Sequence, residues 1–426
     1  MRTAIVVGAG AGGAAAAREL QGKFQVTVFE EGRSFRPMKL SLGWMEGLKR
    51  SGLVFDERQI QLFFPAMKIY RLPGQVLVRG RGEGGTTTIS CGNALRLDGD
   101  LKALGIDLEQ EFAALEREVP VTTDTQRLWH EPTRRFFTAC EEMGLDPRPL
   151  PKMGRYELCA GCGRCVLGCP RGVKWDSREF LRDAEAKGAR MITGCRVERV
   201  VLEGGRAVGI TARLGGKRRF FPADLVILAA GGLGTPVILE KSGLLCEKRL
   251  FVDPVLTVAA PWPGARQGRE MPMPFMVQRD RYIISPYFDY LSYIFNRSWR
   301  NPADDVAGPM IKLADEPTGA VGLHGIDKPL TAGDEAALRE GIELCRELFL
   351  RCGIGQDRIF LGTLNAGHPG GSLPLTEREA ATLHHDRLPY NLYVADATLL
   401  PRSLGAPPIL TVMALAMKVA KAAMIA

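Results

Sequence analysis

The chain has 426 residues, of which 46% are hydrophobic and 24% are charged, and its formal net charge is +8. This composition is ordinary for a globular protein and excludes intrinsic disorder, a collagen-like chain and a small disulfide scaffold. No stretch approaches the roughly 20 uninterrupted apolar residues of a membrane span, and no run of five like charges marks a nucleic-acid-binding arm. A strand pattern starts directly after Met1, Arg2 and Thr3, which leaves no room for a signal peptide, so we expect a cytoplasmic protein.

The first elements predict a nucleotide site. Residues 4–7 form an apolar, β-branched run, residues 8–13 are rich in glycine, and residues 14–20 favour a helix. Gly8, Gly10 and Gly13 fit the pattern G-x-G-x-x-G between a strand and a helix. In that pattern the first glycine permits a tight turn, the second lets the backbone approach a pyrophosphate, and the third lets the helix pack closely on the strand.

A second predicted strand, residues 26–29, ends at Glu30. The carboxylate lies about 20 residues after the glycines, where it can accept hydrogen bonds from both ribose hydroxyls of a dinucleotide. FAD and NAD share this fingerprint, so it does not decide between them.

Later segments predict that this nucleotide-binding domain is discontinuous. Residues 225–230 and 392–395 are apolar runs typical of buried strands of the same parallel sheet. We therefore assign residues 1–99, 186–249 and 366–426 to the nucleotide-binding domain, with insertions at 100–185 and 250–365. The second insertion closes with an amphipathic helix that buries Cys345 and Cys352 and follows a capping pattern at Thr331 and Asp334.

The first insertion carries four of the ten cysteines within eleven residues. Cys159, Cys162, Cys165 and Cys169 fit C-x2-C-x2-C-x3-C-P, the spacing that binds a [4Fe-4S] cluster in ferredoxins. Zinc sites normally pair two separated C-x2-C halves, so the cluster is favoured, and a structural loop without metal is the alternative. In two-cluster ferredoxins the fourth cysteine serves the other cluster. Here either Cys169 or a remote cysteine, Cys91 or Cys195, completes the set, and we favour the four local residues.

Three further segments resemble the glucose-methanol-choline (GMC) family of flavoprotein oxidoreductases. Residues 80–89 and 231–243 are similar to its two signatures, the second departing at Gly232, and residues 392–416 are similar to its C-terminal flavin-binding segment. The resemblance implies an α/β fold with a Rossmann-like FAD-binding domain and an inserted α+β substrate domain at 250–365. The cysteine spacing, and not the resemblance, adds a small iron-sulfur loop at 159–170. The cofactor residues that it adds to those of the fingerprint are Arg81, Gly84, Gly85, Thr86, Asp396, Ala397 and Pro408.

Two of these residues also have simpler interpretations. Asp396 could be an ordinary helix cap. Pro407 and Pro408 precede a helical stretch at 409–426, and prolines suit the first turn of a helix. The positive end of that helix could stabilise an anionic reduced flavin by roughly 0.3–1 kcal/mol; a packed terminal helix is the alternative.

The family resemblance also implies a catalytic histidine. Residues 367–372 are similar to the family's H-x-x-G segment, in which His368 would take the proton of a substrate hydroxyl. His384 and His385 lie in a polar stretch that we expect at the surface. The family usually has a second His or Asn where Pro407 stands, so Asn365 or Tyr287 would have to fill that role, or the chemistry differs.

These features together predict an FAD-dependent oxidoreductase that moves hydride between a small organic substrate and FAD. Single electrons would pass through the [4Fe-4S] cluster to or from a ferredoxin-like or other one-electron carrier, because flavin converts between two-electron and one-electron chemistry. The aromatic stretch at 282–299 suggests an apolar or ring-containing substrate, although such stretches are more often core. The alternative is a flavin/iron-sulfur electron carrier or redox sensor that turns over no small molecule.

Overall fold

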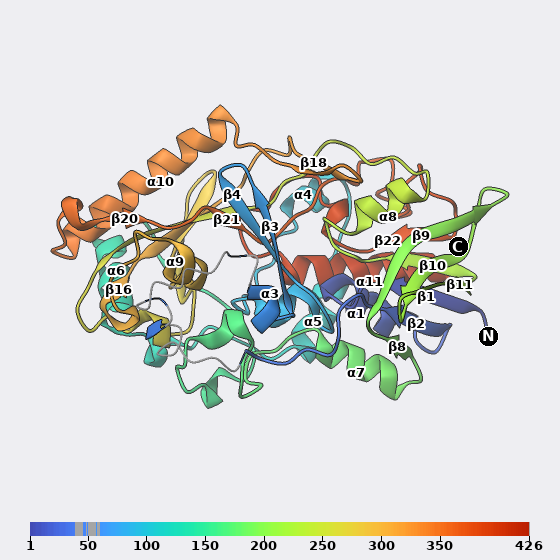
Figure 1. The fold of residues 1–426 in the computed structure, drawn as a ribbon, viewed down its shortest axis with the longest axis horizontal. Helices are drawn as coiled ribbons and strands as arrows, with labels where there is room; N and C mark the ends of the chain where they lie inside the picture. Colours follow the sequence, from blue (N-terminus) through green and yellow to red (C-terminus); the bar gives the residue numbers. More distant parts are fainter. Residues whose placement is uncertain (39–45, 48, 50–56, 58–59, 426) are drawn as a thin grey trace.

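The computed structural model describes residues 1–38, 46–47, 49, 57 and 60–425. Figure 1 shows a parallel sheet with both chain termini at one end of the molecule and a larger, mostly antiparallel sheet toward the other. The cavity that concerns function lies where these two parts meet.

The parallel sheet joins strands from the start, the middle and the end of the chain. Its order is β22 (Leu392–Val394), β12 (Leu225–Leu228), β1 (Thr3–Val7), β2 (Gln25–Phe29) and β8 (Arg190–Ile192), and all four pairings are parallel. β12 and β22 are buried along their whole length, as helices on both faces of a parallel sheet require. The predicted strands are confirmed, whereas the short, half-exposed β8 was not predicted.

Helices with small side chains pack tightly on this sheet. α1 (Ala11–Leu20) contacts α7 (Arg178–Ala186) and α11 (Ile409–Ile425). Ala14, Ala15, Ala16 and Ala17 of α1 are all at most 1% exposed, so α11 approaches the α1 backbone closely. Within the ranges given above, no helix has the length and hydropathy needed to cross a bilayer.

A three-stranded antiparallel sheet was also missed. It consists of β9 (Cys195–Glu203), β10 (Arg206–Leu214) and β11 (Lys217–Pro222). Gly204 and Gly205 connect the first two strands and Gly215 and Gly216 the next two, and all four glycines have positive φ. Paired glycines are a hairpin signal because type I′ turns need positive φ at both central residues.

The large sheet crosses the predicted domain boundaries at residues 99 and 250. Its order is β3 (Met67–Leu72), β4 (Gln75–Gly80), β21 (Asn365–Ala366), β13 (Pro254–Pro261), β17 (Pro309–Leu313), β15 (Tyr282–Pro286), β14 (Phe275–Gln278) and β6 (Arg148–Pro149), with β16 (Val306–Ala307) and β20 (Phe360–Leu361) paired to β13. β3, β4 and β6 thus lie outside residues 250–365 and still hydrogen-bond into the sheet. The domain boundaries themselves stay a prediction.

Helix α10 (Ala332–Arg351) covers this sheet and matches its predicted course. Thr331 and Asp334 form a complete capping box, and Cys345 and Cys352 are buried in the apolar core beneath the helix. The remaining helices and strands are α3 (Ile60–Phe63), α4 (Gly99–Ala103), α5 (Glu109–Glu118), β5 (Val121–Thr122), α6 (Glu131–Glu142), β7 (Lys152–Met153), α8 (Thr235–Lys241), α9 (Tyr290–Phe295), β18 (Ala320–Gly322) and β19 (Gly325–Asp327).

Glycines allow three backbone segments to meet at the carboxyl edge of the parallel sheet. A Cβ on Gly8, whose φ is +104°, would lie 2.2 Å from the carbonyl oxygen of Ala229. A Cβ on Gly12 would lie 1.9 Å from the carbonyl oxygen of Ala395. The turn and the start of α1 therefore depend on side-chain-free residues at these positions.

We expect Gly12→Ala to destabilise the fold by about 1–3 kcal/mol, because its methyl group would overlap a backbone carbonyl that cannot rotate away. Gly99→Ala is the matched control, since Gly99 also begins a helix but has no atom within 4 Å of the added Cβ. Urea unfolding followed by circular dichroism measures both. Equal stability of the two variants would contradict the close packing at Gly12.

Candidate functional site

A cavity of about 800 Å³ opens at the carboxyl edge of the parallel sheet, where nucleotides bind in folds of this type. It collects residues that lie far apart in the sequence. The predicted site residues on its wall are Gly8, Gly10, Glu30, Gly85, Thr86, His368, Asp396, Ala397 and Pro408. Gly13, Arg81 and Gly84 are not on the wall.

The glycine turn and the loop before the 3-10 helix η2 (Gly85–Ile89) form one side of the cavity. A Cβ on Gly85 would lie 2.8 Å from the Cα of Gly10, so these two backbones approach each other with no side chain between them. The N-terminus of α1 begins here, and its free N–H groups favour an anion. Gly13 and Gly84 allow close packing instead, since their added Cβ atoms would meet the oxygen of Gly8 and the side chain of Thr88.

Glu30 is held rigidly at the end of β2. Its carboxylate, in a residue only 7% exposed, accepts backbone N–H groups of Ala9 at 3.0 Å, Gly32 at 2.8 Å and Gly82 at 3.0 Å. A carboxylate has roughly four acceptor positions, so capacity for about one more donor remains on the cavity wall. A ribose hydroxyl is such a donor, and the residues present therefore fit the adenosine half of a dinucleotide.

Two arginines near Glu30 differ in their position relative to the cavity. Arg79 lines the cavity and pairs with Glu31, whereas the side chain of Arg81 is 42% exposed and lies 3.9 Å from the same carboxylate. Arg196 also lines the wall. Sequence reasoning singled out Arg81 from the glycine-rich loop and missed Arg79, two residues earlier on the strand.

Asp396 is both a cap and a wall residue. Its carboxylate accepts the N–H of Thr398, which caps a short 3-10 turn, and also the N–H of Gly231 at 2.8 Å and the hydroxyl of Thr235 at 2.6 Å. Burial raises the pKa of Asp396. The residue thus ties the end of β22 to the start of α8.

His368 follows β21 closely in the chain and lines the cavity wall. Its Nδ1 is buried and 3.5 Å from a carboxylate oxygen of Asp253, while the side chain keeps 21% exposure. A close backbone contact fixes this segment, because a Cβ on Gly232 would lie 2.0 Å from the carbonyl oxygen of Pro369. Gly232, at which the sequence departs from the family signature, is therefore the residue on which the segment that follows His368 packs.

A buried charged pair lies behind the histidine. Lys312 of β17 binds Asp253 at 2.5 Å, and both side chains are 1% exposed. Ser403 donates a hydrogen bond to the other carboxylate oxygen of Asp253. Sequence reasoning identified none of these three residues, because they are not adjacent in sequence and match no motif.

The predicted substitutes for a second catalytic His or Asn do not reach the cavity wall. The side-chain amide of Asn365 donates to Asp289 and to the carbonyl of Thr363, and Tyr287 packs in a separate apolar cluster. The aromatic stretch belongs to the core: Tyr282, Phe288, Tyr290, Tyr293 and Trp299 are each at most 5% exposed, and none lines the large cavity. The stretch therefore carries no information about the substrate.

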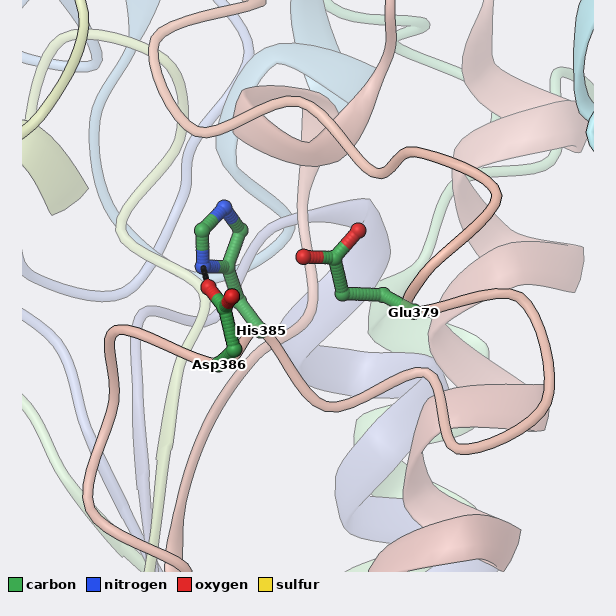
Figure 2. A group of neighbouring side chains, drawn as sticks. All are labelled: Glu379, His385 and Asp386. Carbon is green, nitrogen blue, oxygen red and sulfur yellow. Dashed lines mark ion pairs between the residues drawn. The ribbon is translucent and has the colours of Figure 1, made fainter.

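The expectation that His385 lies at the surface is wrong. It is 4% exposed, and with Glu379 and Asp386 it forms a group whose ligand atoms lie within 4.8 Å of one another (Figure 2). Local bonds account for this group: Glu379 accepts the N–H and hydroxyl of Thr376, and His385 Nδ1 accepts the N–H of Arg387. We therefore do not assign it a metal.

The cysteine loop lies against the cavity-lining segment. The 3-10 helix η5 (Arg164–Leu167) packs on η2, whose first three residues line the cavity. Cys165 is buried and the other three cysteines are partly exposed. The N–H of Gly161 points at Cys159 Sγ at 3.5 Å. In the described part of the chain, no three of these sulfurs lie within 4.8 Å of one another, as a single tetrahedral zinc ion would require.

Two lysines are fully buried beside this loop. The ammonium group of Lys174 donates to the carbonyl oxygens of Thr87, Thr88 and Ser90 at 2.9–3.0 Å, and that of Lys152 donates to Asn93 and to the carbonyl of Pro272. Among the residues that the structure describes, neither pairs with a carboxylate. Burial lowers the pKa of Lys152 to about 8, and Cys91 and Cys165 are the neighbouring groups that oppose this change.

The two remote cysteines differ in position. The carbonyl oxygen of Cys91 accepts a hydrogen bond from Lys152, so Cys91 lies near the buried lysine beside the cysteine loop. Cys195 begins β9, its backbone N–H donates to the carbonyl oxygen of Glu30, and the residue lines the large cavity.

We expect Glu30→Gln to weaken FAD binding roughly tenfold or more, because a hydrogen bond to a charged group contributes about 1.5–3 kcal/mol. Glu83→Gln is the control: it removes the same charge from the neighbouring loop but does not line the cavity. The fluorescence of FAD released on dialysis measures the dissociation constant. Equal constants for the two variants would show that Glu30 does not bind the ribose.

Comparison with known proteins identifies the family. A family model described as GMC oxidoreductase matches residues 4–255. The uncharacterized protein MJ1450 of Methanocaldococcus jannaschii is 24% identical over 419 residues, which cover 97% of each chain. The uncharacterized GMC-type oxidoreductase Rv0492c of Mycobacterium tuberculosis is 34% identical over 263 residues, 58% of this chain but only 40% of the relative.

Two further similarities concern proteins with named activities. The long-chain-alcohol oxidase FAO1 of Arabidopsis thaliana is 24% identical over 500 residues, 96% of this chain and 65% of the relative. The crystal structure of pyridoxine 4-oxidase from Mesorbium loti superimposes with a TM-score of 0.75 over 99% of both chains at 18% identity, which shows a shared fold. Because the family model covers more than half of the 426 residues, the protein belongs to the GMC oxidoreductase family and is an FAD-dependent oxidoreductase.

Proposed function

We propose that this enzyme oxidises a CH–OH group with FAD and passes the electrons one at a time through a [4Fe-4S] cluster at residues 159–170. The observation that carries the oxidation is the position of His368: it is on the wall of the cavity that also holds the glycine turn and Glu30. The cysteine loop, whose helix η5 packs on the cavity-lining helix η2, carries the second part.

In this proposal the protein residues bind the cofactor and handle one proton. Gly10, Gly85 and the N-terminus of α1 would bind the pyrophosphate, and Glu30 the ribose. FAD, when bound, supplies the acceptor for the hydride that leaves the substrate carbon. His368 takes the hydroxyl proton, so the alcohol loses one hydride and one proton and becomes a carbonyl compound.

The substrate class rests on relatives. Long-chain-alcohol oxidases and pyridoxine 4-oxidase are named for oxidation of an alcohol group. Dodecanol and pyridoxine are therefore suitable first probes, one aliphatic and one aromatic. Pro408, Ile409 and Val412, which line the same cavity as His368, are apolar and would help to exclude water from it.

We expect His368→Gln to slow anaerobic bleaching of the flavin by an alcohol roughly 100-fold or more, the usual contribution of a positioned general base. His324→Gln is the control, because His324 lines the same cavity but, unlike His368, is not placed within 4 Å of a carboxylate of the buried charged pair. Stopped-flow absorbance measures the limiting rate. An unchanged rate in His368→Gln would exclude the role of His368, and absence of bleaching in the wild-type protein by any alcohol tested would favour an electron carrier or redox sensor.

The case for a cluster rests on charge as well as spacing. Among the described residues, neither Lys152 nor Lys174 forms an ion pair with a carboxylate, although the charge of Asp176 acts on Lys174. Buried ammonium groups are costly unless an anion lies nearby. A [4Fe-4S] cluster with four thiolate ligands is such an anion, and the sulfurs of a cube are spaced more widely than those around one zinc ion, because each binds a different iron. Lys152 and Lys174 would then stabilise the cluster, and the partly exposed cysteines would face a one-electron carrier.

We expect about four irons and four sulfides per chain in protein purified without oxygen, and loss of this iron when Cys159, Cys162, Cys165 or Cys169 is replaced by Ser. Cys195→Ser is the control and should keep the iron. Cys91→Ser identifies the fourth ligand. If Cys91→Ser loses iron and Cys169→Ser keeps it, the fourth ligand is Cys91 and not Cys169. Zinc in place of iron would contradict the proposed electron path.

A further inference from the structure

We infer that Asp253 positions His368 for catalysis, by holding a proton on Nδ1 so that Nε2 presents its lone pair to the substrate, and that Lys312 is the fixed counter-charge of this carboxylate. The inference deepens the proposed function and rests on it for its kinetic consequences. Asp253 and Lys312 would be positioning residues, since neither touches the substrate.

The sheet brings these residues together. Asp253 directly precedes β13, and Val255 of that strand pairs with Lys312 of β17 on one side and with Asn365 of β21 on the other. One residue, Gly367, separates His368 from the end of β21, and the backbone N–H of His368 donates to the carbonyl of Val252 at 3.3 Å. The histidine and the lysine thus reach the same carboxylate from two neighbours of one strand.

The backbone at Asp253 is specially arranged. Its φ is +53°, a left-handed conformation that few residues other than Gly, Asn and Asp adopt readily. Asp315 accepts the N–H groups of Val252 and Asp253, at 2.8 Å for the latter, and is itself paired with buried Lys328 at 3.1 Å. This backbone conformation costs free energy, and the buried charges of Asp315 and Lys328 hold it in place. Such an arrangement indicates that the direction of the Asp253 side chain is important for function.

The atoms of the ring support one tautomer. Nδ1 is buried, and Asp253 is the polar group that the structure brings to it, at 3.5 Å. A buried carboxylate accepts and does not donate when ionised, so Nδ1 carries the proton. Because Nδ1 is buried while the side chain of His368 keeps 21% exposure and lines the cavity, the accessible atoms of the ring are others than Nδ1.

The surrounding charges act on His368 in opposite directions. Burial lowers the pKa of His368, the positive charge of Lys312 lowers it further, and Asp253 raises it. Although burial favours the protonated acid, Lys312 and His368 together hold the pKa of Asp253 below its usual range. Asp253 and Lys312 are the charged groups that face the ring, with Asp315 and Lys328 one step behind. The ring is therefore kept neutral and able to accept a proton.

Two substitutions should move the pH profile in opposite directions. The reaction needs neutral His368, so its rate rises with pH through the pKa of that group. Lys312→Met removes a charge that lowers this pKa, so the rising limb should move to higher pH. Asp253→Asn, which tolerates the left-handed backbone, removes a charge that raises it, so the limb should move to lower pH and the limiting rate of flavin bleaching should fall about tenfold or more.

The tautomer is measured independently of turnover. In FAD-loaded full-length protein labelled with ¹⁵N-histidine, the resonance of His368, assigned from His368→Gln, should show a protonated Nδ1 in the wild type and lose that preference in Asp253→Asn. Glu111→Gln is the matched control, because it breaks another buried carboxylate–lysine pair, with Lys421, away from the cavity. If Asp253→Asn fails to fold, the double variant Asp253→Asn/Lys312→Met takes its place, because it leaves no unpaired lysine in the interior.

Each outcome has one meaning. A protonated Nε2 in the wild type, or limbs that move in the same direction in the two single variants, would overturn the inference even if alcohols are oxidised. A protonated Nδ1 that depends on Asp253, in a protein that oxidises no alcohol, would support the positioning and contradict the proposed function.

Discussion

The arrangement of this site depends on backbone segments that touch without intervening side chains. Gly8 and Gly12 lie against the carbonyl oxygens of Ala229 and Ala395, and Gly232 lies against that of Pro369. These contacts join the start, the middle and the end of the chain at one edge of the parallel sheet. The cavity, the glycine turn and the histidine segment keep their positions because no Cβ separates them.

Buried charge is handled in two different ways around this cavity. Behind His368, Asp253 and Lys312 neutralise each other, and Ser403 donates a hydrogen bond to the other carboxylate oxygen of Asp253. Beside the cysteine loop, Lys152 and Lys174 bind carbonyl oxygens and, among the described residues, no carboxylate. The first arrangement pairs its own charges, whereas in the second the two buried ammonium groups are bound to neutral oxygens, and the cluster that we propose would place negative charge beside them.

Local patterns made much of the fold predictable. The glycine turn, the capping box at Thr331 and Asp334, and the terminal helix after Pro408 were all found from sequence because each is encoded within a few residues. Four strands of the parallel sheet followed from short apolar or β-branched runs. The large sheet did not, because strands such as β3 and β6 become part of it only through pairing with distant segments.

The candidate site was predictable only where a motif exists. Gly10, Glu30 and His368 were named and line one cavity, whereas Asp253 and Lys312 are 59 residues apart and meet through strand register. His385 was misjudged because its sequence neighbours are polar, yet a local turn buries its ring. Burial set by tertiary packing overrides local polarity in such cases.

The most direct test of the two-cofactor account is to follow the electrons after one turnover. Anaerobic protein is mixed with an alcohol that bleaches its flavin, frozen at successive times and examined by electron paramagnetic resonance. The account predicts the signal of a reduced iron–sulfur cluster, appearing after the flavin bleaches and absent from Cys165→Ser. Complete bleaching of the flavin with no cluster signal at any time, in protein that contains its full iron, would contradict it.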